Sequence, residues 1–399
     1  MISVEEARRR VIASVRPLGA EMVGLRAACG RVLAADVAAR IAHPQAAVSA
    51  MDGYAVRSAD IACVPATLRV VAQSAAGHPV DIRIEPGEAV RIFTGALVPA
   101  GADTIVLQED TQTGPEQTVT VCAFSPVDRH IRPAGLDFKV GEALLRAGRC
   151  LTFRDIALAA AMNVSWLPVV RRPQVAILST GDEIRLPGET IGPGDLIGSN
   201  GFALSAFVES HGGVAIDLGI ARDERASLRT LVSAVRGAEL LLTSGGVSVG
   251  EYDLMHEALG EVGFVLDFWK VAVRPGKPLM SGYLAGVPVI GLPGNPVSAM
   301  VGAILFVLPA LNALRGLPPE SGLEQRTGVL TCDMPANDGR EDYLRARWIH
   351  TADGKILVTP FAQQDSAMQA LLATANGLAI RPPHAPPARA GNPIAIIAL

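Results

Sequence analysis

Aromatic residues make up only 4 % of this 399-residue chain, and charged residues only 19 %. Proteins that stack on bases need aromatic side chains, and nucleic-acid binding needs a clear excess of basic residues. Here 35 lysines and arginines stand against 39 aspartates and glutamates, which gives a formal net charge of −4. We therefore expect no nucleic-acid partner.

Cysteine is also scarce. The five cysteines lie far apart without a C-x-x-C pair, and the seven histidines are equally scattered. An odd, dispersed set of cysteines in a long chain indicates reduced thiols rather than a disulfide framework. Neither set has the ligand spacing of a zinc site.

Long hydrophobic runs are missing as well. The longest, at residues 299–311, contains Pro309 and is shorter than the roughly 20 residues that a membrane-spanning helix needs. The first fifteen residues show an amphipathic helical pattern, with Ser3 and Glu6 in the positions of a capping box and no signal-peptide core. These features predict a cytoplasmic protein without a membrane partner.

The composition changes along the first 170 residues. Residues 3–35 have apolar residues at helical spacing, and helical character returns after residue 140, where Thr152 and Asp155 are placed as a capping box. Between these segments, short alternating runs are punctuated by glycine and proline, as in a small β domain. The pattern predicts a helical N-terminal domain at 1–46 and 140–168, interrupted by an inserted β domain at 47–139.

The remainder of the chain has two further patterns. In residues 169–316, near-continuous apolar strands such as "QVAILST" and "AELLLTS" are followed by glycine-bearing loops and helical stretches. This alternation predicts an α/β domain with a doubly wound, parallel sheet. Residues 320–399 return to short strands and proline-rich turns, which predict a small C-terminal β-barrel. The fold class is therefore α/β and multidomain.

Three strand ends in the α/β domain carry glycine-rich loops. Glycine permits close approach of a ligand to the backbone, and the amino end of a following helix offers free N–H groups to an oxyanion. A single loop of this kind would be an ordinary turn, but ligands bind outside the carboxyl ends of such strands. The candidate ligand-binding residues in these loops are Thr180, Gly181, Ser244, Gly245, Gly246, Ser248, Pro293, Gly294 and Asn295.

Charged residues accompany these loops. Helix capping would explain any one of the acids alone, but several acids beside phosphate-type loops would repel one another unless a cation such as Mg²⁺ joined them. These candidate metal ligands are Asp182, Glu183, Asp223 and Asp253. The "WKVAVRPGKPL" segment adds three cations around a rigid Pro-Gly break, which would suit an anion better than freely solvated lysines would. They are Lys270, Arg274 and Lys277.

Two motifs in the β block stay undecided on chemistry alone. Asp52-Gly53 and Thr94-Gly95 can both be interpreted as hairpin turns. Nothing in their local pattern separates a turn from a functional site.

Six motifs in a fixed order resemble the molybdopterin molybdenumtransferase family, the MoeA and gephyrin E-domain group. The resemblance covers nearly the whole chain and is far more specific than any one motif. The motifs are "SAMDGYAV", "RIFTGALVPAGADTIV", "ILSTGDEI", "SGGVSVGEYD", "RPGKPL" and "GLPGNPVSA".

The resemblance implies a four-domain, elongated homodimer with its active site between the subunits. Such proteins take adenylylated molybdopterin and molybdate as substrates, insert molybdenum at the dithiolene and release AMP, with the help of Mg²⁺. A molybdopterin adenylyltransferase and molybdoenzyme chaperones are the implied protein partners.

The resemblance also implies roles for individual residues. Glu183 would be central to catalysis, and three residues would face the site from the β block, namely Asp52, Thr94 and Asp137. Asp182, Asp223 and Asp253 would help to bind metal or ligand. Anionic groups would be held by Lys270, Arg274, Lys277, Arg345 and Ser366.

Some positions depart from the family pattern. Leu136 replaces a glutamate in "GLD", the basic run before it is thinned to Arg132, and Arg274 stands where many members have lysine. The thinned segment favours an alternative function, a paralogue that binds and delivers molybdopterin or its cofactor without turnover, whereas the intact Asp52, Glu183 and Asp253 argue against it. A third reading, an adenylyltransferase that makes the adenylate, shares the central domain but usually lacks the flanking β domains.

Overall fold

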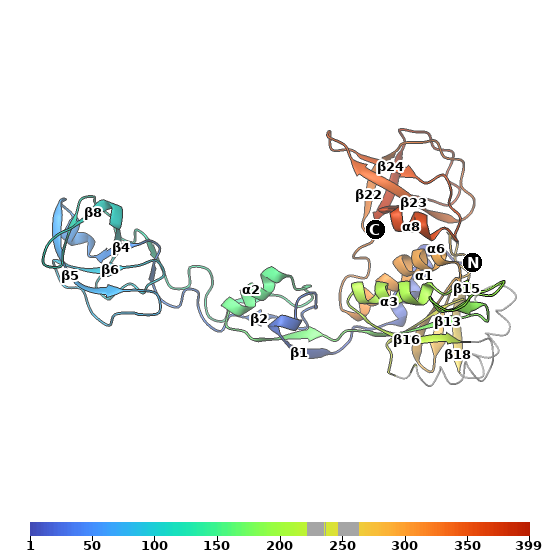
Figure 1. The fold of residues 1–399 in the computed structure, drawn as a ribbon, viewed down its shortest axis with the longest axis horizontal. Helices are drawn as coiled ribbons and strands as arrows, with labels where there is room; N and C mark the ends of the chain where they lie inside the picture. Colours follow the sequence, from blue (N-terminus) through green and yellow to red (C-terminus); the bar gives the residue numbers. More distant parts are fainter. Residues whose placement is uncertain (222–234, 236, 246–262) are drawn as a thin grey trace.

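The computed structural model describes residues 1–221, 235, 237–245 and 263–399. Four predicted site residues therefore lie outside the described residues: Asp223, Gly246, Ser248 and Asp253. Figure 1 shows an elongated molecule in which a narrow arm joins a distal β domain to a body made of the α/β domain and the C-terminal barrel.

The α/β domain is built on a six-stranded mixed sheet. Its first four strands are parallel, and its last two are antiparallel to their neighbours. The strand order is β16 (Val214–Ala221), β13 (Gln174–Thr180), β17 (Leu240–Ser244), β21 (Val287–Leu292), β20 (Met280–Leu284) and β18 (Phe264–Trp269). The α/β prediction is confirmed.

The sequence pattern predicted a parallel sheet, whereas the last two strands are antiparallel. β20 and β21 form a hairpin, and Ala285 and Gly286 both adopt positive φ in the turn between them. That conformation is typical of a two-residue hairpin turn.

Alternate residues of β13 enter two different cores. Val175 and Ile177 face the larger core, formed with α3 (Asn200–Ser210), α6 (Pro296–Gly302), the π-helical turn η4 (Ala303–Val307) and α7 (Leu308–Leu314). Ala176 and Leu178 face the opposite side of the sheet. The run Pro296–Leu314 is long and apolar enough to cross a membrane by length and composition, longer than the predicted 299–311 segment. Its most apolar window is 89 % buried within the protein, as in a core helix.

The first helix, α1 (Val4–Ser14), packs on η4 and α7 in the body. Pro309 lacks an N–H group and so cannot bond the carbonyl of Leu305 four residues earlier. That carbonyl instead accepts a hydrogen bond from Arg8 Nε at 3.3 Å. By its packing, α1 belongs to the core of the α/β domain. The predicted domain boundaries, which assign it to the N-terminal domain, remain a prediction.

The arm has more β structure than its sequence predicted. The helix predicted over 3–35 ends at Ser14, and β1 (Ala20–Gly24) then pairs antiparallel with β12 (Trp166–Val170). Two shorter strands, β2 (Val37–Ala38) and β11 (Ala143–Leu145), also pair. One predicted helix does form: α2 (Phe153–Ala161) begins at the capping box of Thr152 and Asp155. Pro17 and Gly19 explain the early end of the helical pattern.

The distal domain is a six-stranded sheet, as predicted for the inserted block. Its order is β7 (Thr104–Leu107), β4 (Gly53–Val56), β6 (Glu88–Ile92), β5 (Ala66–Ser74), β9 (Thr118–Val121) and β8 (Thr111–Thr113). At its base, β3 (Val48–Ser49) pairs with β10 (Ile131–Arg132).

The C-terminal domain is a closed barrel, as predicted. Pairing of β23 with β25 closes a five-stranded sheet, and the short β19 adds to its side. The strands are β19 (Val273–Arg274), β22 (Gln325–Leu330), β23 (Glu341–His350), β24 (Ile356–Pro360), β25 (Gly377–Arg381) and β26 (Pro393–Ala398). Helix α8 (Gln369–Thr374) lies between the barrel and α6.

Candidate active site

Three of the predicted loops meet at the carboxyl edge of the central sheet. Ser244 lies opposite Ser179 of β13 on one side and Leu292 of β21 on the other. The backbone N–H of Gly245 donates to the carbonyl of Leu292 at 3.3 Å. Parallel strands that end at the same level of a sheet bring the residues that follow them close together. β13, β17 and β21 do so here.

Two glycines in these loops adopt positive φ. A Cβ atom on Gly245 (φ +95°) would lie 2.5 Å from the carbonyl oxygen of Thr180, so this position has no room for a side chain. A Cβ atom on Gly181 (φ +141°) would meet only the carboxylate of Glu183, the end of an exposed side chain that can move. Gly245 therefore requires glycine for its φ and for close backbone approach, and Gly181 for its φ.

Two hydroxyl groups at the same edge have no hydrogen-bond partner among the residues that the structure describes. Thr180 is 5 % exposed and Thr243 is 2 % exposed, and the Oγ1 atom of each is unbonded. Buried polar groups in proteins are nearly always hydrogen-bonded, so an unpartnered one calls for an explanation. Both atoms are free to bond a ligand or an ordered water.

Asn200, the first residue of α3, ties two of the loops together. Its Nδ2 group donates to Ser244 Oγ at 2.7 Å and to the carbonyl of Gly294 at 2.8 Å. The loops are thereby fixed relative to each other without a ligand, which is the preorganisation that a binding site needs.

The acids of the "TGDEI" loop are exposed. Asp182 and Glu183 precede β14 (Ile184–Arg185), which pairs with β15 (Leu196–Ile197), and the carbonyl of Glu183 accepts a hydrogen bond from Leu196. Within the described ranges, no group of three or more His, Cys, Asp or Glu side chains could hold a metal by itself. Two adjacent carboxylates do fit Mg²⁺, which commonly binds one or two protein carboxylates together with substrate phosphates.

The "RPGK" loop borders the third loop. A Cβ atom on Gly276 would lie 3.9 Å from Pro293 Cγ, and Lys277 is exposed. The Nζ atom of Lys270 lies 3.6 Å from the centroid of the Trp269 ring, a cation–π contact that leaves its hydrogen-bond donors available. Anion binding by Lys270 and Lys277 remains a prediction.

Arg274 is engaged by carboxylates. Its Nε donates to Asp342 Oδ1 at 2.8 Å, its Nη2 bonds the other oxygen of Asp342, and its Nη1 lies 3.3 Å from Asp338 Oδ2. The hydrogen bonds to Asp342 raise the pKa of Arg274 above its usual range. The guanidinium predicted to hold an anion of the ligand is therefore already neutralised within the protein.

Arg345, on β23, is a buried cation. Its side chain is 2 % exposed; Nη1 donates to the carbonyl of Met368 at 3.0 Å and Nε to Gln364 Oε1 at 3.3 Å. In the described ranges of the chain, its Nη2 atom has no hydrogen-bond partner. Burial lowers the pKa of Arg345. A buried guanidinium with a free donor is suited to an anion.

Ser366 joins the barrel to the third loop. Its Oγ accepts a hydrogen bond from Asn295 Nδ2 at 3.0 Å, and its carbonyl accepts one from the N–H of Val297. The C-terminal domain thus brings Ser366 against the loop that follows β21.

The residues predicted in the β block lie far from this edge. Asp52 Oδ1 accepts hydrogen bonds from the N–H and the Oγ1 of Thr94, both at 2.7 Å, and these bonds lower the pKa of Asp52, the backbone bond most. Asp137 is exposed at the base of the distal domain. In Figure 1 the distal domain with β4 and β6 lies at the opposite end of the molecule from β13, so one chain does not bring Asp52 to Glu183.

Comparison with known proteins agrees with this architecture. Residues 2–163 match the MoeA N-terminal region (domain I and II), residues 176–313 a probable molybdopterin binding domain, and residues 327–399 the MoeA C-terminal region (domain IV). Molybdopterin molybdenumtransferase 2 of Mycobacterium tuberculosis is 36 % identical over 95 % of both chains. The molybdopterin molybdenumtransferase of Haemophilus influenzae is 34 % identical over 92 % of this chain and 91 % of its own. The chain belongs to the molybdopterin molybdenumtransferase family.

The solved structures of the family confirm the fold. A molybdopterin biosynthesis MoeA protein from Pyrococcus horikoshii is similar with a TM-score of 0.86 and 29 % identity, over 100 % of this chain and 99 % of that one. Another MoeA structure, a molybdopterin biosynthesis MoeA protein from Pyrococcus horikoshii OT3, gives a TM-score of 0.82 and 26 % identity, over 100 % of both chains. The likeness includes the arm, the distal domain, the α/β domain and the barrel.

Sequence reasoning missed two residues of the site. Asn200 stands in "IGSNGFAL", where Ser-Asn before an apolar run signals a helix start and could have singled it out. Thr243 gave no signal, because a threonine within a buried strand is ordinary and its missing hydrogen bond is visible only in three dimensions.

Proposed function

We propose that this protein is a molybdopterin molybdenumtransferase: it takes adenylylated molybdopterin and molybdate, inserts molybdenum at the dithiolene and releases AMP. The observation that carries the proposal is the sheet edge, where three glycine-rich loops meet around the unpartnered hydroxyl of Thr180. Family membership supplies the reaction, and the printed names of its relatives support it.

The loops suit the phosphate and pterin part of the substrate. The backbone at Gly181, Gly245 and Gly294 can approach a ligand closely, and Thr180 offers a hydroxyl that is already desolvated. Hydrogen bonds from such fixed donors are strong because no water has to be reorganised around them.

Glu183 and Asp182 are placed to act on the phosphoanhydride. Its hydrolysis adds the oxygen of a water to phosphorus and expels AMP, so the site needs an oriented water and neutralised phosphate oxygens. Mg²⁺, when bound, supplies that neutralisation. In the proposal, Asp182 and Glu183 hold the ion, and the Glu183 carboxylate also orients the water or accepts its proton.

Arg345, Ser366 and Lys277 are proposed to bind molybdate. Molybdate is a tetrahedral dianion, and a buried guanidinium beside a hydroxyl and an exposed ammonium can neutralise and orient it. Lys270 would add a second ammonium. Arg274, being paired with Asp342, would act by holding the barrel in place rather than by touching the anion.

Asp52, Thr94 and Asp137 would complete the site only from a second chain. Their distance from the sheet edge within one chain supports a homodimer whose sites lie between subunits. In the cell, we expect a cytoplasmic enzyme that works beside a molybdopterin adenylyltransferase and molybdoenzyme chaperones.

The test is to incubate the purified protein with adenylylated molybdopterin, Mg²⁺ and molybdate, and to measure AMP release and pterin-bound molybdenum together. We expect both in the wild type and neither in E183Q, which keeps the side-chain shape and removes its charge. The control is E209Q, which removes an exposed carboxylate of α3 in the same domain. Near wild-type insertion by E183Q would refute the role of Glu183.

The residue at position 136 supports a second candidate function, that of a delivery protein. Leu136 is 58 % exposed in the segment where the family has an acid, next to Asp137. A delivery protein without turnover would bind adenylylated molybdopterin tightly and release no AMP, so the same assay separates the two.

A further inference from the structure

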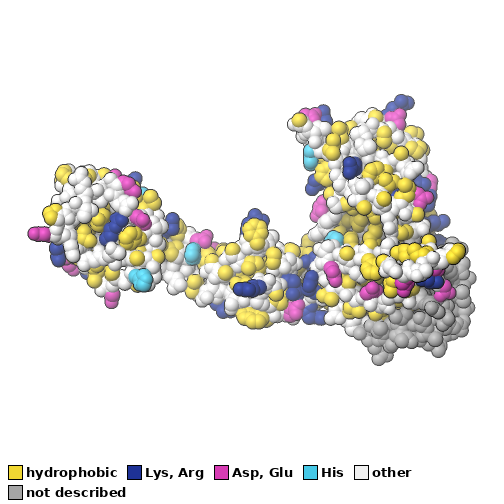
Figure 2. Space-filling view, in the orientation of Figure 1, with side chains coloured by type: hydrophobic (Ala, Val, Ile, Leu, Met, Phe, Trp, Pro, Cys, Tyr) yellow, Lys and Arg dark blue, Asp and Glu magenta, His cyan; other side chains and the backbone are white. Residues whose placement is uncertain are grey.

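A cleft lies where the arm joins the body, and basic side chains gather there in Figure 2. Its walls come from Gly30–Val32 and Val170–Arg172 of the arm, and from Gly212 and Arg315 of the α/β domain. We call it the joint cleft. It is small and partly open to solvent. Four of its eight lining residues are arginines: Arg31, Arg171, Arg172 and Arg315.

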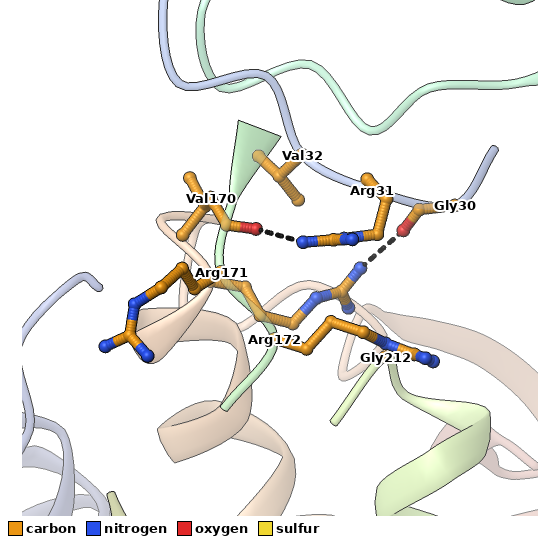
Figure 3. A pocket seen from close by; sticks show the side chains of 8 residues that line it. Gly30, Arg31, Val32, Val170, Arg171, Arg172 and Gly212 are labelled. Atoms are coloured by element: carbon orange, nitrogen blue, oxygen red, sulfur yellow. Dashed lines mark hydrogen bonds between the residues drawn. The ribbon is translucent and has the colours of Figure 1, made fainter. Parts of the chain in front are cut away.

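The joint cleft is built around Arg315. A Cβ atom on Gly212 would lie 2.6 Å from Arg315 Cζ, so glycine there makes room for the guanidinium. Arg315 donates to the carbonyl of His211 in the body at 2.8 Å and to the carbonyl of Gly30 in the arm at 3.0 Å. Figure 3 shows the second of these bonds beside the one from Arg31 to the carbonyl of Val170. The arginines thus connect the two parts of the molecule.

The positive charge in the joint cleft is only half neutralised. Arg31 pairs with Glu21, and Arg171 lies 3.2 Å from Glu239. For Arg172 and Arg315, the described part of the chain provides no carboxylate within ion-pair distance. Four guanidinium groups and two carboxylates leave a charge of about +2 at this site.

The pKa of Arg315 is consistent with a net positive charge in the joint cleft. Burial lowers the pKa of Arg315, and the positive charges of Arg172 and Arg31 lower it further, against an opposing effect of Cys150. A cation whose charged form is disfavoured by burial and by like charges gains most from a bound anion.

We propose that the joint cleft binds a small tetrahedral oxyanion of the phosphate type, with a charge of about −2, which braces the arm against the body. Arginine binds phosphate oxygens through two parallel N–H groups, and Arg172 has all its donors available. The site is separate from the sheet edge: Gly212 lies just before β16, whereas Thr180 ends the neighbouring β13. A seven-residue strand separates those ends by roughly 20 Å. The proposal thus goes beyond the proposed function.

The test is a calorimetric titration of the full chain with inorganic phosphate at constant ionic strength. We expect R172Q to weaken phosphate binding about tenfold, the usual effect of losing one charged hydrogen bond. Because Arg172 makes no hydrogen bond or ion pair with the residues that the structure describes, R172Q should fold normally. The matched control is R154Q, which removes an exposed arginine of α2 outside the joint cleft. It should keep the phosphate affinity of the wild type.

Two results would overturn the proposal: no phosphate binding by the wild type, or equal phosphate affinity in the wild type and R172Q. A parallel titration with AMP identifies the source of the anion. Arg172-dependent binding of AMP that is tighter than that of inorganic phosphate would mean a phosphate carried by a nucleotide. Arg172-dependent binding of inorganic phosphate alone would mean a free ion.

Discussion

Arg274 and Asp342 form a bidentate ion pair that fastens the α/β domain to the barrel. The pair sits where β19 adds in parallel to β23, with Arg274 directly opposite Asp342. Asp342 is 4 % exposed, whereas 42 % of the Arg274 side chain is exposed. The carboxylate is the buried member of the pair, so the arginine serves chiefly to supply its hydrogen bonds. Because Arg345 lies three residues further along β23, this pair also determines where the proposed molybdate donor stands.

Replacing Arg274 should therefore change stability as well as activity. R274A leaves the buried carboxylate of Asp342 without its main donor, and we expect a loss of about 1–3 kcal/mol in the free energy of unfolding. R274K, the residue common in the family, keeps the charge without the two-pronged geometry and should lose less. Urea unfolding measures both, with R154A as the control on an exposed arginine.

A double-mutant cycle distinguishes this role from direct anion binding. If Arg274 acts through Asp342, the double variant R274A/D342N should be more stable than R274A, because the second change removes the charge that the first left unpaired. Independent, additive losses from the two changes would contradict the positioning role.

Gly245 should tolerate no side chain. In G245A, the added Cβ would meet the carbonyl oxygen of Thr180 at 2.5 Å, so the loops at the sheet edge must move apart. We expect a loss of substrate binding together with about 1–3 kcal/mol of stability. The control is G188A, whose φ of +92° is close to the +95° of Gly245 but whose added Cβ meets nothing within 4 Å. Equal effects in the two variants would mean that φ alone, and not contact with Thr180, requires glycine.

Replacing Arg345, unlike replacing Arg274 or Gly245, should change the stability of the protein little. R345M removes two hydrogen bonds, worth about 1 kcal/mol each, but it also removes an unpaired charge from the interior, which offsets much of that cost. We expect a small change in the urea midpoint and at least a tenfold loss of molybdate affinity, measured by calorimetry. A large loss of stability with unchanged molybdate binding would make Arg345 a purely structural residue.

Asp52 should titrate at a lower pH than an ordinary aspartate, because Thr94 donates two hydrogen bonds to its ionised form. A depressed folded-state pKa stabilises the protein above the pKa of the unfolded chain, and that contribution is lost as the pH falls through the folded pKa. T94V removes the hydroxyl bond and keeps the backbone bond, so the pKa of Asp52 should rise part of the way toward its usual value. Carbon-13 NMR titration of the Asp52 carboxyl measures this. T120V, which changes a threonine elsewhere in the distal sheet, should leave the Asp52 titration as in the wild type.

The parts of this molecule that the sequence predicted are those governed by short stretches. The strand-end loops followed from apolar runs that stop at glycine, and the capping box of α2 from the spacing of Thr152 and Asp155. At α1 the same reasoning was half right: Ser3 accepts from the N–H of Glu6, but the Glu6 carboxylate pairs with Arg9 and Arg10 instead of closing the box.

What the sequence did not predict depends on contacts between distant residues. The packing of α1 on the body rests on Arg8 reaching a carbonyl almost 300 residues away. The pairing of Arg274 turned a predicted anion ligand into a neutralised one, and its partner Asp342 carries no local motif. The β character of the arm arises because β1 and β12, which are far apart in sequence, pair with each other.

The separation of Asp52 from Glu183 within one chain leads to a complementation test of the homodimer. Suppose that each site combines the sheet edge of one subunit with the distal domain of its partner, as two-fold symmetry would require. A heterodimer of E183Q and D52N chains then has one site with both changes and one site with neither. The subunits are mixed by co-expression with two different affinity tags, and the doubly tagged heterodimer is purified. Each heterodimer has one intact site of two, so it should show roughly half of wild-type AMP release, although each variant alone is inactive. If both residues served the same chain's site, the heterodimer would be inactive. If Asp52 had no role in the reaction, D52N alone would release AMP.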